Sequence, residues 1–290
     1  MVNTRIIPRL DIKGPNLVKG IHLEGLRVLG KPEHFARYYY QQGADELIYM
    51  DVVASLYGRN SLLEIVERTS REIFIPLTVG GGLRTLDDIR NALRAGADKV
   101  SLNTAAIHNP NLIKAASQRF GSSTILVSIE AIKKPDGCYE AYTDNGREST
   151  GVEVFEWAIK VAELGAGEIM VTSIDREGTG KGFDLKLTRR IAESVPIPVI
   201  ACGGAGKISD VYDVISQGKA DAVSIASILH YNFVKHHDTS DDFSGEGNIE
   251  YLRGRRGLST IQDAPLPEIK NYLTQHGVQC RHPITRAAHV

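Results

Sequence analysis

The sequence has few cysteines and no long apolar run, and these absences exclude several classes of protein. Only three cysteines occur among its 290 residues, and none forms a Cys-x-x-Cys pair. We therefore expect neither a disulfide framework nor a zinc site, and a reducing cytoplasm suits such a chain. No apolar run approaches the roughly 18 residues of a membrane helix, and the first residues lack the apolar segment of a secretory signal.

An excess of charge of one sign is also lacking. The chain has 34 Lys and Arg against 35 Asp and Glu, a formal net charge of −1. Proteins that bind nucleic acid or anionic membranes usually carry a basic excess, so we expect neither as a partner. The sequence contains no His-Glu-x-x-His or comparable ligand spacing, so we expect no metal and no cofactor.

What is present is a regular alternation of short apolar runs and amphipathic segments. The runs are β-branched and only a few residues long, which is typical of strands buried on both faces of a parallel sheet. Helical patterns such as 62–70 and 89–95 lie between them, and Thr85 with Asp88 resembles a capping box. The expected strands are 5–12, 46–52, 75–79, 98–102, 124–130, 168–172, 197–202 and 221–225. Strands that alternate with helices predict βα units and a parallel sheet.

The two halves of the chain repeat one design. Gly-Ala-Asp at 43–45 precedes the second strand, and Gly-Ala-Gly at 165–167 precedes the sixth, an offset of 122 residues. Glycine clusters at 80–82 and 203–204 end the third and seventh strands, an offset of 123 residues. An open doubly wound sheet does not require this symmetry and would usually show Gly-x-Gly-x-x-Gly after its first strand. We therefore predict an α/β fold, a (β/α)₈ TIM barrel with an internal two-fold repeat.

Two glycine clusters predict phosphate sites at the ends of the strands, where such barrels carry their functional residues. A glycine-rich turn that enters a helix presents backbone N–H groups to an anion. The residues are Gly81 and Gly82 with Asn103 and Thr104, and Gly204 with Ala226 and Ser227. Two sites predict a substrate with a phosphate at each end. Tight turns without a ligand are the alternative interpretation.

Two carboxylates end symmetry-related strands. Asp11 ends the first strand and Glu130 the fifth, 119 residues further along. Opposed carboxylates supply a general acid and a general base, so we predict that both are catalytic; a surface salt bridge with Lys13 or Lys19 is the alternative. Arg9 shares a strand face with Asp11 and should point into the barrel, where a buried guanidinium needs a partner such as Glu130 or a bound phosphate.

These motifs resemble the cyclase subunit of imidazole glycerol phosphate synthase over about residues 4–232 and again over 266–281. The matching stretches are Arg-Ile-Ile-Pro at 5–8, Leu-Asp at 10–11, Val-Lys-Gly at 18–20, Thr-Val-Gly-Gly-Gly at 78–82, Lys-Val-Ser at 99–101, Asn-Thr-Ala-Ala at 103–106, Thr-Ser-Ile-Asp-Arg at 172–176, Gly-Thr at 178–179 and Gly-Gly-Ala-Gly-Lys at 203–207. The sister isomerase of histidine biosynthesis shares the fold and the phosphate glycines, but 103–106 and 172–176 match the cyclase better.

The resemblance implies a function that joins histidine and purine synthesis. A glutaminase subunit would dock on the N-terminal face of the barrel, and its ammonia would pass through the barrel to a bisphosphate ribonucleotide. The products would be imidazole glycerol phosphate and an aminoimidazole carboxamide ribonucleotide. The resemblance adds Lys19, Thr172, Glu177 and Gly178 to the substrate site. It also implies an ammonia gate of four charges, Arg5, Glu46, Lys99 and Glu168, for which a structural salt-bridge ring is the alternative.

The chain also departs from the family. Glu130 and Glu177 stand where the family has Asp, and Arg9 stands where it commonly has Cys. Each Glu extends its charge by about one methylene, and displacements of ~1 Å can slow catalysis ~100-fold. A second hypothesis is therefore a paralogue that passes glutaminase-derived ammonia to another acceptor enzyme, such as one that amidates surface sugars.

The family also lacks a segment at about 236–265, before the last helix. We predict a single barrel domain over 1–281 with this insertion, followed by a tail over 282–290. Two smaller domains would suit the same length.

Overall fold

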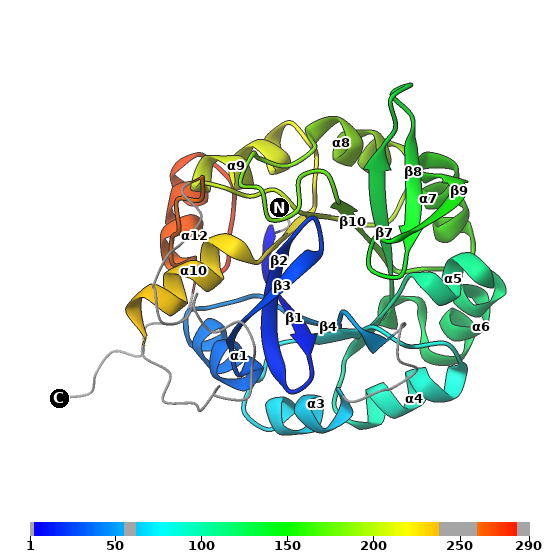
Figure 1. Ribbon diagram of the computed structural model, residues 1–290, viewed down its shortest axis with the longest axis horizontal. Coiled ribbons are helices and arrows are strands. Elements are labelled where there is room, and N and C mark those ends of the chain that lie inside the picture. Colours follow the sequence, from blue (N-terminus) through cyan, green and yellow to red (C-terminus); the bar gives the residue numbers. More distant parts are fainter. Residues whose placement is uncertain (1–2, 55–61, 238–259, 283–290) are drawn as a thin grey trace.

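Eight parallel strands close into a barrel in the computed structural model, which describes residues 3–54, 62–237 and 260–282. In ring order they are β1 (Arg5–Lys13), β4 (Leu47–Asp51), β5 (Leu77–Gly80), β6 (Lys99–Leu102), β7 (Ile125–Lys133), β10 (Glu168–Ser173), β11 (Val199–Cys202) and β12 (Ala222–Ile225). The pairing of β12 with β1 closes the ring. Figure 1 shows the strands at the centre and the helices around them. The predicted TIM barrel is confirmed, and all eight predicted strands are present.

The helices bury one face each against the outside of the barrel. They are α1 (Pro32–Gln41), α3 (Leu63–Ser70), α4 (Leu86–Arg94), α5 (Thr104–His108), α6 (Asn111–Phe120), α7 (Val154–Glu163), α8 (Leu185–Ser194), α9 (Ile208–Ser216), α10 (Ser227–His236) and α12 (Leu266–Gln275), with a 3₁₀ turn at Ser122–Thr124. The predicted capping box is confirmed: Asp88 N–H donates to Thr85 Oγ1 at 3.1 Å, and Thr85 N–H donates to the Asp88 carboxylate at 2.9 Å. Within the described ranges, no helix has the length and apolar character needed to cross a membrane.

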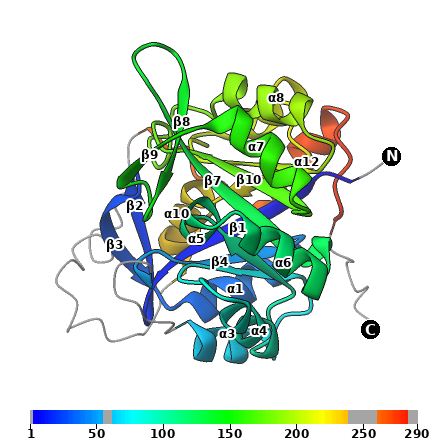
Figure 2. The ribbon, with the colours of Figure 1, turned by 90° about the vertical axis from the view of Figure 1, so that its right-hand side faces the viewer.

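Two β-hairpins that the sequence analysis did not predict extend the barrel. β2 (Asn16–Ile21) and β3 (Glu24–Gly30) follow β1, while β8 (Tyr139–Thr143) and β9 (Glu148–Glu153) follow β7. Figure 2 shows both hairpins at one end of the barrel and the N-terminus at the other. The strands that carry Asp11 and Glu130 therefore both continue into a hairpin at the same end, as the two-fold repeat requires.

The inside of the barrel changes from apolar to polar along its axis. One buried cluster includes Ile7, Ile48, Leu126, Met170 and Ile200, which come from five different strands. Strand residues alternate between the two faces of a sheet, so the inward positions nearer the hairpins are two residues further along each strand. Three of those five positions are polar, namely Arg9, Ser128 and Thr172, while the other two are Met50 and Cys202.

After α9 the left-handed conformation is adopted by Lys219, with φ 59°, and not by the preceding Gly218. Most of the insertion at 236–265 lies outside the described residues, as does the tail from 283 on. Where the description resumes, Gln262 N–H donates to Gly206 O at 2.7 Å, so this segment lies against the loop after β11. The domain bounds 1–281 stay a prediction.

Candidate active site

A cavity of about 470 Å³ opens at the carboxyl ends of β4 to β7. Five residues that the sequence predicted line it together: Gly81, Gly82, Asn103, Thr104 and Glu130. Asp51 and Ser101, which lie near the ends of two of the predicted strands, also line it. The sequence analysis assigned no functional role to the other polar lining residues, namely Arg84, His108, Asn109, Ser128, Asp144 and Asn145. Asp144 and Asn145 lie in the β8–β9 turn, which had not been predicted. The cavity has the size of a small-molecule site.

A second, much smaller cavity of about 10 Å³ lies at the ends of β10 to β12. It gathers the other predicted residues, Glu177, Gly178, Gly204, Ala226 and Ser227, and also Arg9. Such a volume holds about one water-sized sphere. The residues of the two predicted phosphate sites therefore form two separate clusters, and their cavities differ greatly in volume. Phosphate binding at either cluster stays a prediction.

The glycines that mark both sites are also required by the backbone. Gly81 has φ +96°, and a Cβ there would overlap the carbonyl oxygen of Asp51. Gly204 has φ +112°, and a Cβ there would overlap the carbonyl oxygen of Gly182. Close packing alone therefore explains these two glycines. The case for bound phosphate depends instead on the larger cavity and on the donors around each site.

Arg9 and Asp11 form a buried ion pair inside the barrel. Arg9 is 2% exposed and Asp11 is 4% exposed, and Arg9 Nε donates to Asp11 Oδ1 at 2.8 Å. Arg9 Nη1 donates to Thr172 Oγ1 at 3.3 Å, which places the predicted Thr172 beside this pair. Asp11 is thus the direct partner of Arg9. The surface salt bridge proposed as the alternative role of Asp11 is wrong, because the pair is internal.

Glu130 is buried in a different environment. Gly146 N–H, in the β8–β9 turn, donates to Glu130 Oε2 at 2.8 Å. Burial raises the pKa of Glu130 to about 7, while the positive charge of Arg9 opposes this and Asp11 and Asp144 add to it. A carboxyl group with a pKa near neutrality is suited to proton transfer. Asp11 pairs directly with a cation, so the two carboxylates lie in different environments.

Lys19 and Glu177 form a second buried ion pair, next to the small cavity. Lys19 Nζ also donates to Gly20 O at 2.9 Å. Burial opposes the charged form of each, but their mutual attraction prevails, so the pKa of Lys19 is raised and that of Glu177 is lowered. His22 N–H donates to Glu177 O at 2.9 Å. These contacts fasten the β2–β3 hairpin to the loop after β10.

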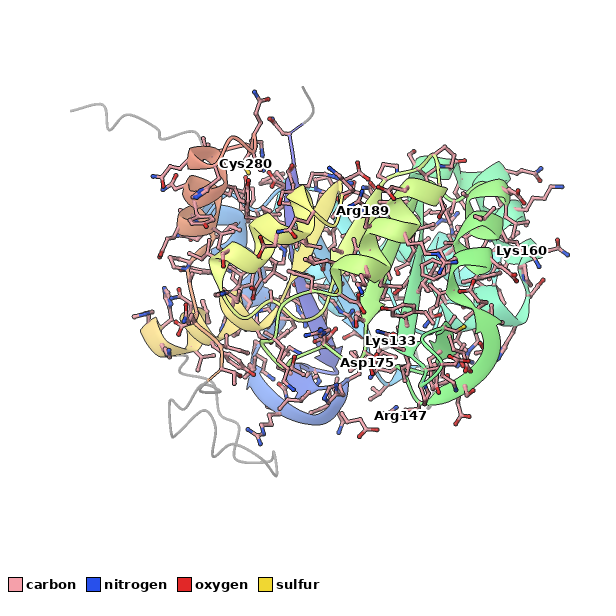
Figure 3. The ribbon with its side chains drawn as sticks, turned by 90° about the horizontal axis from the view of Figure 1, so that it is seen from above. Lys133, Arg147, Lys160, Asp175, Arg189 and Cys280 are labelled. Carbon is pink, nitrogen blue, oxygen red and sulfur yellow. The ribbon has the colours of Figure 1, made fainter. Side chains whose placement is uncertain are left out.

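Four charges form a closed ring at the starts of the strands. Arg5 Nη1 lies 2.6 Å from Glu46 Oε1 and 2.7 Å from Glu168 Oε1. Lys99 Nζ lies 3.1 Å from Glu46 Oε2 and 3.0 Å from Glu168 Oε2. Each cation thus contacts both anions. The ring lies at the opposite end of the barrel from the cavities. Figure 3 shows the two ends, with Lys133, Arg147 and Asp175 at the hairpin end and Cys280 at the other.

The chain is similar to known proteins of histidine biosynthesis. A family described as "Histidine biosynthesis protein" matches residues 5–235. Three relatives are named "Imidazole glycerol phosphate synthase subunit HisF". The one from Legionella pneumophila is 60% identical over 210 residues, 72% of this chain and 99% of the relative. Those from Alkaliphilus metalliredigens and Methanocaldococcus jannaschii are 48% and 50% identical, over 81% and 80% of this chain and 93% and 92% of the relatives.

Proposed function

Because the chain belongs to the family of the imidazole glycerol phosphate synthase subunit HisF, we propose that it is the cyclase subunit of that synthase. It uses ammonia from a glutaminase subunit to convert a bisphosphate ribonucleotide into imidazole glycerol phosphate and an aminoimidazole carboxamide ribonucleotide. The reaction closes an imidazole ring and cleaves the ribonucleotide, so it needs proton transfers at several atoms. We place the protein in the cytoplasm, where this substrate class is made and used.

The observation that carries the proposal is the pair of unlike carboxylates at symmetry-related strand ends. Glu130, with a pKa of about 7, both accepts and releases a proton near neutral pH. Asp11 instead forms a buried ion pair with Arg9. We assign Glu130 and Asp11 the acid and base roles. The substrate phosphates bind at the two cavities, one at Gly82, Asn103 and Thr104 and the other at Gly204 and Ser227.

We assign the ring of Arg5, Glu46, Lys99 and Glu168 the role of the ammonia gate. Charges at the strand starts have no role in chemistry at the other end of the barrel, and a closed ring blocks water there. The glutaminase docks on this face. Phe74 precedes β5 and is 79% exposed, with Tyr40 against its edge at 6.2 Å between ring centroids. An exposed Phe74 packed against a half-buried Tyr40 suits the core of a protein interface.

The test is turnover of the bisphosphate ribonucleotide with excess ammonium salt at alkaline pH and without glutaminase, because free ammonia bypasses the partner. The wild type should consume the substrate and form both products. Glu130→Gln should reduce turnover at least ~100-fold, whereas Glu156→Gln, the same change at an exposed position on α7, should not. Absence of turnover despite binding of the substrate would refute the cyclase assignment.

The relatives do not favour the two alternatives. A paralogue that only passes ammonia to another acceptor enzyme would bind the glutaminase but fail the ammonium assay. The sister isomerase would act on its own substrate without ammonia. Each of the three relatives is instead named as the HisF subunit.

A further inference from the structure

The two-fold repeat allows one half of the barrel to be compared with the other, residue by residue. Asp11 corresponds to Glu130 with an offset of 119 residues, and the same offset relates Arg9 to Ser128. On the neighbouring strands an offset of 123 relates Ser101 to Ser224 and Thr104 to Ser227. Each cavity is lined by one member of each of the last three pairs. The two cavities are therefore built from equivalent positions.

The equivalence fails at one large side chain. Ser128 lines the larger cavity, and Arg9 occupies the same position beside the smaller one. The volumes are about 470 Å³ and about 10 Å³. A guanidinium in place of a hydroxymethyl group fills space that the other half leaves open. Arg9 thus brings a permanent positive charge to a position that in the other half of the barrel holds a neutral serine.

Several donors around the small cavity have no partner in the part of the chain that the structure describes. Arg9 Nη2 is buried and makes no hydrogen bond, and the same is true of Ser224 Oγ. Helix α10, ten residues long, begins at Ser227 beside the same cavity. Its first N–H groups have no acceptor inside the helix and carry the positive end of the helix dipole. A buried donor without a hydrogen-bond partner costs free energy, so we expect an acceptor to bind at these donors.

We propose that Arg9 is a specificity-determining ligand of the substrate phosphate at β11 and β12, and that its Nη2 donates to a phosphate oxygen that enters the small cavity. The cavity has room for about one such atom, and Ser224 and Ser227, the first residue of α10, line the same space. Arg9 keeps Nε on Asp11, so one rigid guanidinium joins the phosphate to a catalytic carboxylate. The inference rests on the proposed function, because it takes a phosphate ester as the ligand.

Titration calorimetry tests this with the bisphosphate ribonucleotide and with two analogues, each lacking one of its phosphates. Arg9→Met, similar in length but neutral, should weaken binding of the bisphosphate about 10- to 100-fold, the range for a lost charge-assisted hydrogen bond. It should weaken binding of the analogue that keeps the phosphate at this site by the same factor. Binding of the analogue that lacks this phosphate should stay within about 3-fold of wild type. Arg9→Lys should fall in between, because a lysine lacks the guanidinium fork.

Two further variants control for effects of Arg9→Met other than the loss of the phosphate contact. Arg9→Met leaves Asp11 buried without its cation, so Arg9→Met combined with Asp11→Asn, compared with Asp11→Asn alone, repeats the measurement in a neutral background. Arg84→Met removes the same group beside the larger cavity and should not reproduce the preference between the analogues. Equal weakening of both analogues by Arg9→Met, or none, would overturn the inference. If the wild type binds none of the three ligands, the proposed function fails instead.

Discussion

Removing one member of the Arg9–Asp11 pair should destabilise the fold, and removing both should not. Asp11→Asn keeps the shape of the side chain but leaves a guanidinium that is 2% exposed without its direct counter-charge. Two unit charges about 4 Å apart interact by ~4 kcal/mol at an effective dielectric constant of ~20, and breaking a buried pair typically costs ~3–5 kcal/mol. The negative charge of Glu177 also acts on Arg9, so we expect the lower end, ~3 kcal/mol.

Thermal unfolding followed by circular dichroism measures the effect. A loss of ~3 kcal/mol corresponds to a fall in Tm of roughly 6–12 °C for a domain near this size. Arg9→Met should cause a similar fall, and the double variant should recover most of it, so the two effects are strongly non-additive. Additive losses, or a Tm for Asp11→Asn within about 2 °C of wild type, would refute the reasoning. Because of this coupling, lost activity in Asp11→Asn alone would be no proof of a catalytic Asp11.

Three more predictions follow from the site. Glu130 has a pKa of about 7 in the folded protein against an ordinary 4.5, so its ionisation destabilises the fold as the pH rises from about 4.5 through 7. Across that window the free energy of unfolding of Glu130→Gln should rise relative to wild type by up to ~3 kcal/mol. Tm measured against pH checks this, and a Tm difference between the two proteins that stays constant with pH would contradict the shift. Glu46→Gln breaks two ion pairs of the ring and should lower glutamine-driven turnover with the partner far more than ammonium-driven turnover. Equal loss in both assays would argue against a gate. Gly81→Ala should cost ~1–3 kcal/mol more than Gly121→Ala in urea unfolding, since both have positive φ but only Gly81 has backbone in the way; equal losses would show that φ alone matters.

The barrel could be predicted because its signals are local and repeated. Short β-branched runs mark the buried strands, and the glycine clusters recur at a constant offset. The hairpins were missed for the opposite reason, since β2 and β3 contain only weak alternation. The second hairpin did carry a signal: Asp144, Asn145 and Gly146 all adopt positive φ, and Asp-Asn-Gly is a sequence that favours such turns.

The site could be predicted as a set of residues but not as a geometry. Strand ends fix which side chains gather at the mouth of the barrel, so Asp11, Glu130 and the glycines could be named. Distances across the barrel depend on packing between strands that are far apart in the sequence. For that reason the unequal volumes of the two cavities could not be foreseen. The pairing of Arg9 with Asp11 needed no such distance, since both lie on one face of β1.

The position of Arg9 explains how a barrel interior accepts a guanidinium. Four buried charges, Arg9, Asp11, Lys19 and Glu177, form two adjacent ion pairs with no net charge. Glu177 is one methylene longer than the residue that the family has there, and it reaches Lys19 while its charge still acts on Arg9. A buried cation needs compensation nearby, so the two departures at 9 and 177 support each other. They leave the cavity at β4 to β7 untouched, because it shares none of these four residues. The departures at 9 and 177 are therefore confined to the smaller site, whereas the third departure, Glu130, lines the larger cavity. An effect of positions 9 and 177 on activity should appear in binding of the phosphate predicted at the smaller site rather than in passage of ammonia.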